Sequence, residues 1–225
     1  MVAQSVIEHS SPSESISSHP LLADVAAGIE HLRERGALSF GRSYAAATRT
    51  SEHRLLLVTR ASGASTVEGV HLVDAEHAIP PLPATLAGPF AVLRALLSEL
   101  THRSALFVPA PHLTAFAVAG LPLPIVYGSG LLRRTPEAVP VVPWTDALDP
   151  ASVLSVVKAH PRSSAVLLAR RGVLAYGDES IATLAKFVSN LEESAQLTFN
   201  AQLLGGARAL PADAFERMQR GIAGD

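Results

Sequence analysis

The order of the predicted elements is the strongest constraint on the fold, because helical patterns at both ends of the chain enclose a series of short strand patterns. Apolar residues recur at helical spacing from Leu21 to Leu32, and Gly36 follows at the usual C-cap position. A second, longer helix is expected from Ser180 to Leu204, where Gly205-Gly206 stops it. Helices on both sides of a strand set predict an α/β protein with a central sheet covered on both faces.

The segment between these helices contains short apolar runs bounded by polar, Gly or Pro residues. We expect strands at 45–48, 54–59, 67–73, 105–108, 123–127, 139–142, 165–169 and 173–176. Further helices are expected at 90–102, 113–117, 150–160 and 212–222. Residues 1–19 are rich in Ser, Pro and Glu and are expected to form a flexible tail. No internal repeat is evident, so 20–225 is interpreted as one domain.

Composition excludes several kinds of chemistry. The 225 residues contain no cysteine, which removes disulfides, thiolate metal sites and thiol nucleophiles. A net charge of −2 gives no electrostatic reason to expect binding to nucleic acid or to an anionic membrane. The two lysines, Lys158 and Lys186, are expected to be exposed, which makes Schiff-base chemistry a poor candidate. No targeting segment and no uninterrupted apolar run of ~20 residues is visible, so a soluble cytoplasmic protein is expected.

Several stretches, taken in order, resemble the class II aldolase/adducin family. Residues 138–204 carry VPVVPW, then VLLARRGVLAYGDE, then a long helix ending in LLGG. Earlier, GALS at 36–39 precedes a strand pair, RASG at 60–63 replaces a Pro-Ser-Gly loop, and FVPAPHLTAFAVAGLPLP spans 107–124. The resemblance covers about 21–220. It implies a three-layer α/β/α sandwich with a mostly antiparallel sheet, assembled as a homo-oligomer, usually a four-fold tetramer.

The same resemblance implies a divalent metal held by three histidines, and this sequence lacks them. A His-x-His pair would fall on Phe107 and Pro109, and the third histidine on Arg171. The family's acidic residue would fall near Ala87 or Gly88, and the asparagine of its phosphate-binding turn within 44–47, where neither residue type is present. No metal and no other cofactor are therefore expected.

Arg171 is the most informative replacement. A guanidinium at the metal position supplies permanent positive charge to a carboxylate or to an enolate-like oxygen. Arg170 adds a second cation at the same turn. The alternative is that both arginines form a solvated turn or pair with acidic groups across a subunit interface.

Two further residues are candidates for proton transfer. His112 begins the helix that follows the lost histidine pair, and it serves either as an acid–base group or as a capping or surface residue. Tyr127 is a candidate proton donor, as is Tyr44, and both alternatively are half-buried packing residues. Trp144 is interpreted as an interface or core residue.

A binding site for a small anionic molecule is expected around the loop that corresponds to the family's substrate-binding loop. Its candidate residues are Arg60, Ser62 and Gly63, with Arg42 and Ser43 beside them. Glycine-adjacent backbone amides and guanidinium groups both suit a carboxylate or a phosphate.

Three hypotheses follow. The leading one is a metal-independent lyase or isomerase acting on a small carbonyl or carboxylate metabolite, in a bacterial biosynthetic setting. The second is a non-catalytic pseudoenzyme that serves assembly or regulation. The third, an ordinary metal-dependent aldolase aligned in the wrong register, is disfavoured because the chain contains no His-x-His.

Overall fold

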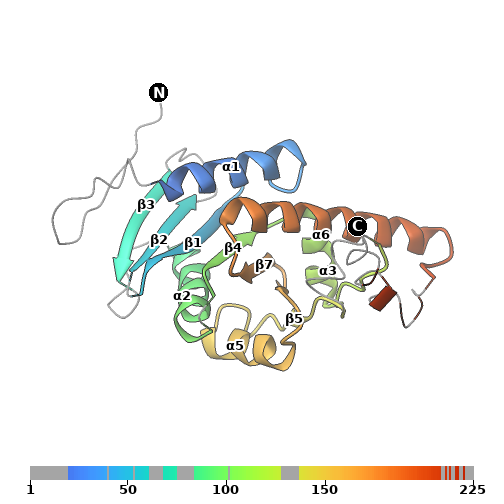
Figure 1. The fold of residues 1–225 in the computed structure, drawn as a ribbon. Coiled ribbons are helices and arrows are strands. Elements are labelled where there is room, and N and C mark those ends of the chain that lie inside the picture. The colour runs from blue at the N-terminus through green and yellow to red at the C-terminus, as the bar shows by residue number, and fades with distance from the viewer. Residues whose placement is uncertain are drawn as a thin grey trace.

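The computed structural model has at its centre a seven-stranded sheet in the order β3-β2-β1-β4-β7-β6-β5 (Figure 1). It describes residues 20–208 except 40, 53, 61–67, 75–83, 101 and 128–136, and then residues 211, 213, 216, 217 and 220. The strands are β1 (Tyr44–Ser51), β2 (Arg54–Arg60), β3 (Glu68–Asp74), β4 (Ser104–Val108), β5 (Val141–Val142), β6 (Ala165–Leu168) and β7 (Gly172–Gly177). Neighbouring strands are antiparallel except β5 and β6, which are parallel.

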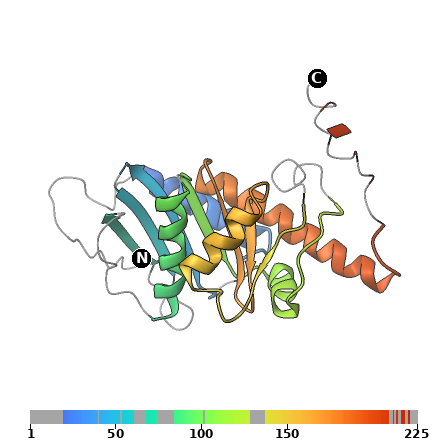
Figure 2. The same cartoon turned by 90° about the horizontal axis from the view of Figure 1, so that it is seen from below.

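Helices cover both faces of this sheet, because alternate residues of the strands are apolar on each side. One face packs against α1 (Leu21–Glu34), α3 (Pro111–Ala119) and α6 (Ile181–Leu203). The other packs against α2 (Ala84–Glu99) and α5 (Pro150–Ala159), which Figure 2 shows lying across the sheet. The predicted three-layer α/β/α sandwich with a mostly antiparallel sheet is confirmed.

The ends of α1 and α6 are locked together by a carboxylate. Asp24 of α1 accepts hydrogen bonds from the backbone N–H groups of Ile181 (2.8 Å) and Ala182 (3.4 Å) at the start of α6. Ser180, the N-cap of α6, accepts a bond from the N–H of Thr183 at 3.3 Å. These contacts satisfy N–H groups that a helix start otherwise leaves unpaired.

Two element predictions are corrected by the structure. The helix expected to begin at Phe90 begins at Ala84 and ends at Glu99, with Pro89 inside its second turn, where proline removes one backbone hydrogen bond and crowds the preceding turn. The strands expected at 123–127 and 139–142 reduce to a bridge between Leu123 and Val139 and to the two-residue β5. Prolines at positions 122, 124 and 140 lack the N–H that a longer ladder needs.

Other expectations concern residues outside the described part of the chain. The predicted tail at 1–19 lies there entirely, and the predicted helix at 212–222 lies there in part. No helix among the described residues is both long enough and apolar enough to span a membrane. Lys158 and Lys186 are exposed, as expected.

Candidate active site

The strand register brings most of the predicted site residues to one end of the sheet. Ala45 pairs with Phe107 and Val108 pairs with Val173, so the start of β1, the end of β4 and the start of β7 lie side by side. Arg170 and Arg171 form the turn between β6 and β7 at this same end.

Gly172 makes the contact between β4 and β7 unusually close. A Cβ atom added there would overlap the carbonyl oxygen of Val108 and lie 2.7 Å from the Cα of Pro109, and its φ is +145°. Only glycine fits both the space and the backbone conformation. The turn that carries Arg171 is therefore held directly against position 109, as the family resemblance implies.

The residues at the three positions where the resemblance implies metal ligands do not fit a divalent cation. Phe107 is 5% exposed and belongs to the apolar core on the α2 and α5 face. Pro109 is buried and has no donor atom in its side chain, and Arg171 carries a positive charge. Among the described residues, no group of three or more His, Cys, Asp or Glu is arranged to hold a metal ion.

Arg171 stacks on the ring of Trp144, with its Cζ 4.9 Å from the ring centroid, and the Cζ of Arg170 lies 5.9 Å from the same centroid. Trp144 is 52% exposed, so its interpretation as a core residue is wrong. The Nε of Arg171 is buried and has no hydrogen-bond partner within the described residues. Arg170 has a left-handed φ of 60°, and this backbone conformation is energetically unfavourable for any residue other than glycine. We call Trp144, Arg170 and Arg171 the cationic platform.

His112 turns toward α6 and contacts Glu192. Its Nδ1 lies 2.8 Å from Oε1 of that carboxylate, and its backbone N–H donates to the same oxygen at 2.8 Å. The N–H of Leu113 donates to Oε2 at 3.0 Å. Glu192 thus caps the start of α3, where Ala110 supplies no side-chain cap.

Glu192 is a site residue that the sequence analysis missed. It lies at helical spacing from Val188 and Ala195, which are both buried. A carboxylate within the apolar stripe of a helix needs partners, because burying an unpaired charge is costly. The position of Glu192 within an apolar stripe can be read from the sequence, but the identity of its hydrogen-bond partners cannot.

Tyr127 is attached to the same turn of α6. Its carbonyl oxygen accepts a hydrogen bond from the hydroxyl of Ser194 at 3.5 Å, and its side chain is exposed. The structure thus places His112 and Tyr127 around positions 192 and 194 of one helix. No hydrogen bond or ion pair between described residues joins His112 to Arg171.

The remaining predicted binding residues are only partly placed. Arg42 is exposed and Ser43 half-buried just before β1, and Arg60 ends β2 opposite Tyr44. Ser62 and Gly63 lie outside the described residues.

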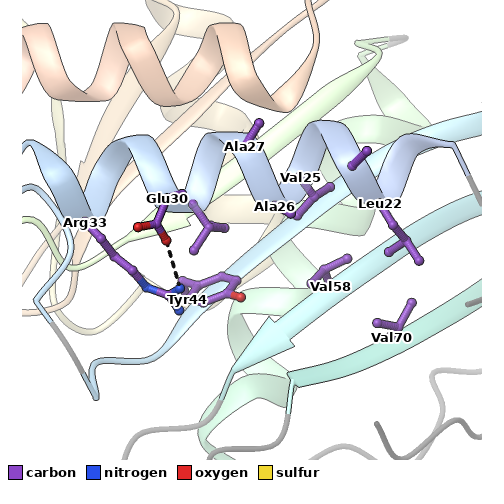
Figure 3. Close-up of a pocket in the computed structure, with 11 residues that line it drawn as sticks. Leu22, Val25, Ala26, Ala27, Glu30, Arg33, Tyr44, Val58 and Val70 are labelled. Atoms are coloured by element: carbon purple, nitrogen blue, oxygen red, sulfur yellow. Dashed lines mark ion pairs between the residues drawn. The ribbon is translucent and has the colours of Figure 1, made fainter. Parts of the chain in front are cut away.

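Tyr44 is 1% exposed, which supports its interpretation as a packing residue. It lines a groove of about 580 Å³ between α1 and the sheet, beside Val58 and Val70 (Figure 3). In that groove Arg33 forms an ion pair with Glu30 at 3.6 Å.

Comparison with solved structures identifies the fold. YgbL from Klebsiella pneumoniae, described as a candidate aldolase, epimerase or decarboxylase, matches with a TM-score of 0.66 at 21% identity, over 92% of this chain and 100% of that one. L-fuculose-1-phosphate aldolase from Thermus thermophilus matches with a TM-score of 0.65 at 23% identity, over 85% of this chain and 98% of that one. An aldolase II superfamily protein from Pseudomonas syringae matches with a TM-score of 0.62 at 17% identity, over 89% and 83% of the two chains.

The sequence itself matches no family model and no curated protein. The structural matches nevertheless cover 85–92% of this chain. The resemblance is therefore confirmed at the level of the fold: this chain has the class II aldolase fold.

Proposed function

We propose that this protein binds a small carboxylate- or carbonyl-bearing metabolite at the cationic platform and acts on it as a lyase or isomerase without a divalent metal. One observation carries the proposal. Arg171 occupies the position where the family resemblance implies a metal ligand, with a buried Nε that lacks a partner among the described residues. A partly satisfied guanidinium next to an exposed aromatic ring suits a carboxylate, which accepts two parallel N–H bonds.

The chemistry follows from this charge. The proposed lyase and isomerase reactions both begin by removing a proton, either from a hydroxyl group or from a carbon next to a carbonyl. In both, negative charge develops on an oxygen atom. A fixed guanidinium stabilises that developing negative charge. His112 is the proposed proton acceptor and Tyr127 the proposed donor, and both lie toward the turn of α6 at 192–194. Arg42, Ser43 and Arg60 are proposed to help bind the anionic part of the substrate.

Trp144 supplies a built-in assay, because it is the only tryptophan in the chain and Arg171 stacks on it. A panel of small carboxylates and sugar phosphates is titrated while its fluorescence and the melting temperature are followed. A ligand present at a concentration of 100 times its Kd stabilises the folded state by about 2.7 kcal/mol. Arg171→Ala should remove both the fluorescence change and the thermal shift.

The matched control is Arg162→Ala. Arg162 precedes β6 and therefore lies at the opposite end of that strand from Arg170, with a side chain that is 55% exposed. The Arg162→Ala substitution removes one positive charge, as Arg171→Ala does, but leaves the cationic platform unchanged. If Arg171→Ala binds the same ligand as tightly as Arg162→Ala does, the role of Arg171 is refuted. A stoichiometric divalent ion found at this site in solution would refute metal independence.

A second candidate function is a non-catalytic assembly module, favoured by exposed apolar side chains. Phe199, Leu203 and Leu204 of the α6 end are 47%, 73% and 89% exposed, and Val118 and Leu121 at the end of α3 are 58% and 52% exposed. The C-terminal part of α6 extends beyond the sheet (Figure 1). Exposed apolar groups of this kind mark interaction surfaces when they are contiguous.

We propose that a second copy of the chain covers these side chains in a homo-oligomer, with a tetramer as the expected form. Light scattering on a sizing column measures the mass in solution. Leu203→Glu should reduce it, whereas Lys186→Glu, an exposed change near the start of the same helix, should not. Pure monomer in the wild type at micromolar concentration would exclude assembly, and a ligand found in the panel above would favour the enzyme.

A further inference from the structure

Glu192 forms a hydrogen-bond arrangement that goes beyond capping a helix. The residue is 7% exposed, and its carboxylate has three nitrogen neighbours on α3. They are the backbone N of His112 at 2.8 Å, the ring Nδ1 of His112 at 2.8 Å and the backbone N of Leu113 at 3.0 Å.

These contacts favour one of the two ring nitrogens of His112 as the one that carries the proton. An ionised carboxylate only accepts hydrogen bonds, so Nδ1 must be the donor in its bond to Oε1. In a neutral imidazole the other nitrogen, Nε2, is then the acceptor. The ring side chain is 36% exposed, whereas that of Glu192 is 9% exposed, so the carboxylate is buried behind a ring that solvent reaches.

Capping alone does not require this geometry. Asp24 caps α6 through the N–H groups of Ile181 and Ala182 and, among the described residues, bonds no imidazole. Glu192 does the equivalent for α3 with His112 and Leu113, and in addition holds a ring. The third bond orients the imidazole, a task that the helix start itself does not need.

We propose that Glu192 is the positioning residue of His112: it holds the proton on Nδ1 and so leaves Nε2 as the proton-accepting atom at the start of α3. This inference rests on the proposed function, in which His112 accepts the substrate proton. The backbone of Tyr127 contacts the next residues of α6, because the hydroxyl of Ser194 donates a hydrogen bond to its carbonyl oxygen at 3.5 Å. One turn of α6 thus orients the ring of His112 and contacts the backbone of Tyr127.

The direct test is the tautomer of His112 in the full chain. Two-bond nitrogen–proton NMR spectra of uniformly ¹⁵N-labelled protein, recorded above neutral pH, distinguish the Nδ1–H and Nε2–H forms. The His112→Gln variant identifies the signals by their loss. The wild type should show the Nδ1–H form, and an Nε2–H form would overturn the inference without any further variant.

Glu192→Gln then tests the cause. The amide keeps the size of the side chain but no longer accepts on both atoms, so the Nδ1–H form should be lost or reduced to a mixture. Glu193→Gln is the matched control, because Glu193 is the next residue on α6 and is exposed. An Nδ1–H form that persists in Glu192→Gln as in Glu193→Gln would overturn the inference. If Glu192→Gln does not fold, the wild-type spectrum still decides.

A second readout separates this inference from the proposed function. Pyruvate carries both a carbonyl and a carboxylate, and proton NMR follows exchange of its methyl protons in D₂O. A C–H proton passes to Nε2, the electron pair moves to the carbonyl oxygen, and a deuteron returns to carbon. His112→Ala should abolish catalysed exchange and Glu192→Gln should reduce it at least about tenfold, while Glu193→Gln leaves it unchanged.

The two readouts fail independently. Absence of exchange in the wild type, or exchange that survives in His112→Ala, would count against His112 as the base while leaving the tautomer result standing. Exchange that depends on His112 but is unchanged in Glu192→Gln would refute the positioning role of Glu192 and leave His112 as the base.

Discussion

Replacing Gly172 by alanine should destabilise the protein strongly, because this glycine joins the arginine turn to the end of β4. The added Cβ would overlap the carbonyl oxygen of Val108 and lie 2.7 Å from the Cα of Pro109. Both neighbours are backbone atoms of buried residues, one at the end of β4 and one just after it, so no flexible side chain can move aside. The φ of +145° is also one that residues with a Cβ rarely adopt.

The magnitude is the sum of two effects. A sparsely populated backbone conformation costs about 1–3 kcal/mol, and overpacking a well-packed core costs about 1–3 kcal/mol. Gly172→Ala should therefore lower the free energy of unfolding by about 2–6 kcal/mol. At roughly 2–4 °C per kcal/mol for a chain of this size, the melting temperature should fall by at least about 4 °C.

Gly120→Ala is the control that separates conformation from space. Gly120 ends α3 with a φ of +67°, and a Cβ there would have no atom within 4 Å. Its cost should be only about 1–2 kcal/mol, from the left-handed conformation alone. Urea unfolding followed by circular dichroism measures both variants, and Trp144 fluorescence reports the displacement of the arginines. Equal destabilisation of the two variants would refute the argument that β4 and β7 require glycine at this contact.

Three further predictions concern charged and titratable groups. Asp24→Ala removes the cap from the N–H groups of Ile181 and Ala182 and should cost about 1 kcal/mol in urea unfolding, whereas an unchanged midpoint would show that the cap contributes nothing. Burial lowers the pKa of His71 below its usual 6.5, so as the pH falls the unfolded chain binds a proton at a higher pH than the folded chain does. The contribution of neutral His71 to the free energy of unfolding should therefore be fully present above about pH 6.5. It should decline as the pH falls toward the folded pKa, by up to about 1.4 kcal/mol per pH unit. His71→Leu should remove that part of the decline, and parallel pH profiles would contradict the assignment. Lys158→Met breaks an exposed ion pair with Glu99 (3.3 Å) and should change stability by less than about 0.5 kcal/mol in the same assay.

Local patterns predicted the elements where apolar periodicity and end signals agree. The helix expected from Ser180 to Leu204 is α6, with Ser180 as its N-cap, and the strands expected at 105–108 and 173–176 are β4 and β7 within a residue or so. The error at 123–127 has a local cause, since apolar content there resembles a strand while the prolines prevent a ladder. Family motifs, rather than periodicity, predicted the antiparallel sheet.

Residue types alone make Phe107, Pro109 and Arg171 unsuitable as ligands of a divalent cation, and these are the positions where the family resemblance implies such ligands. The contacts of these residues depend on how distant segments of the chain pack together. Arg171 meets Trp144, 27 positions earlier, and Glu192 meets His112, 80 positions earlier. The physical reason is that helical and strand patterns arise from neighbours within a few residues, whereas buried charge is paired by whichever distant element the packed layers bring alongside.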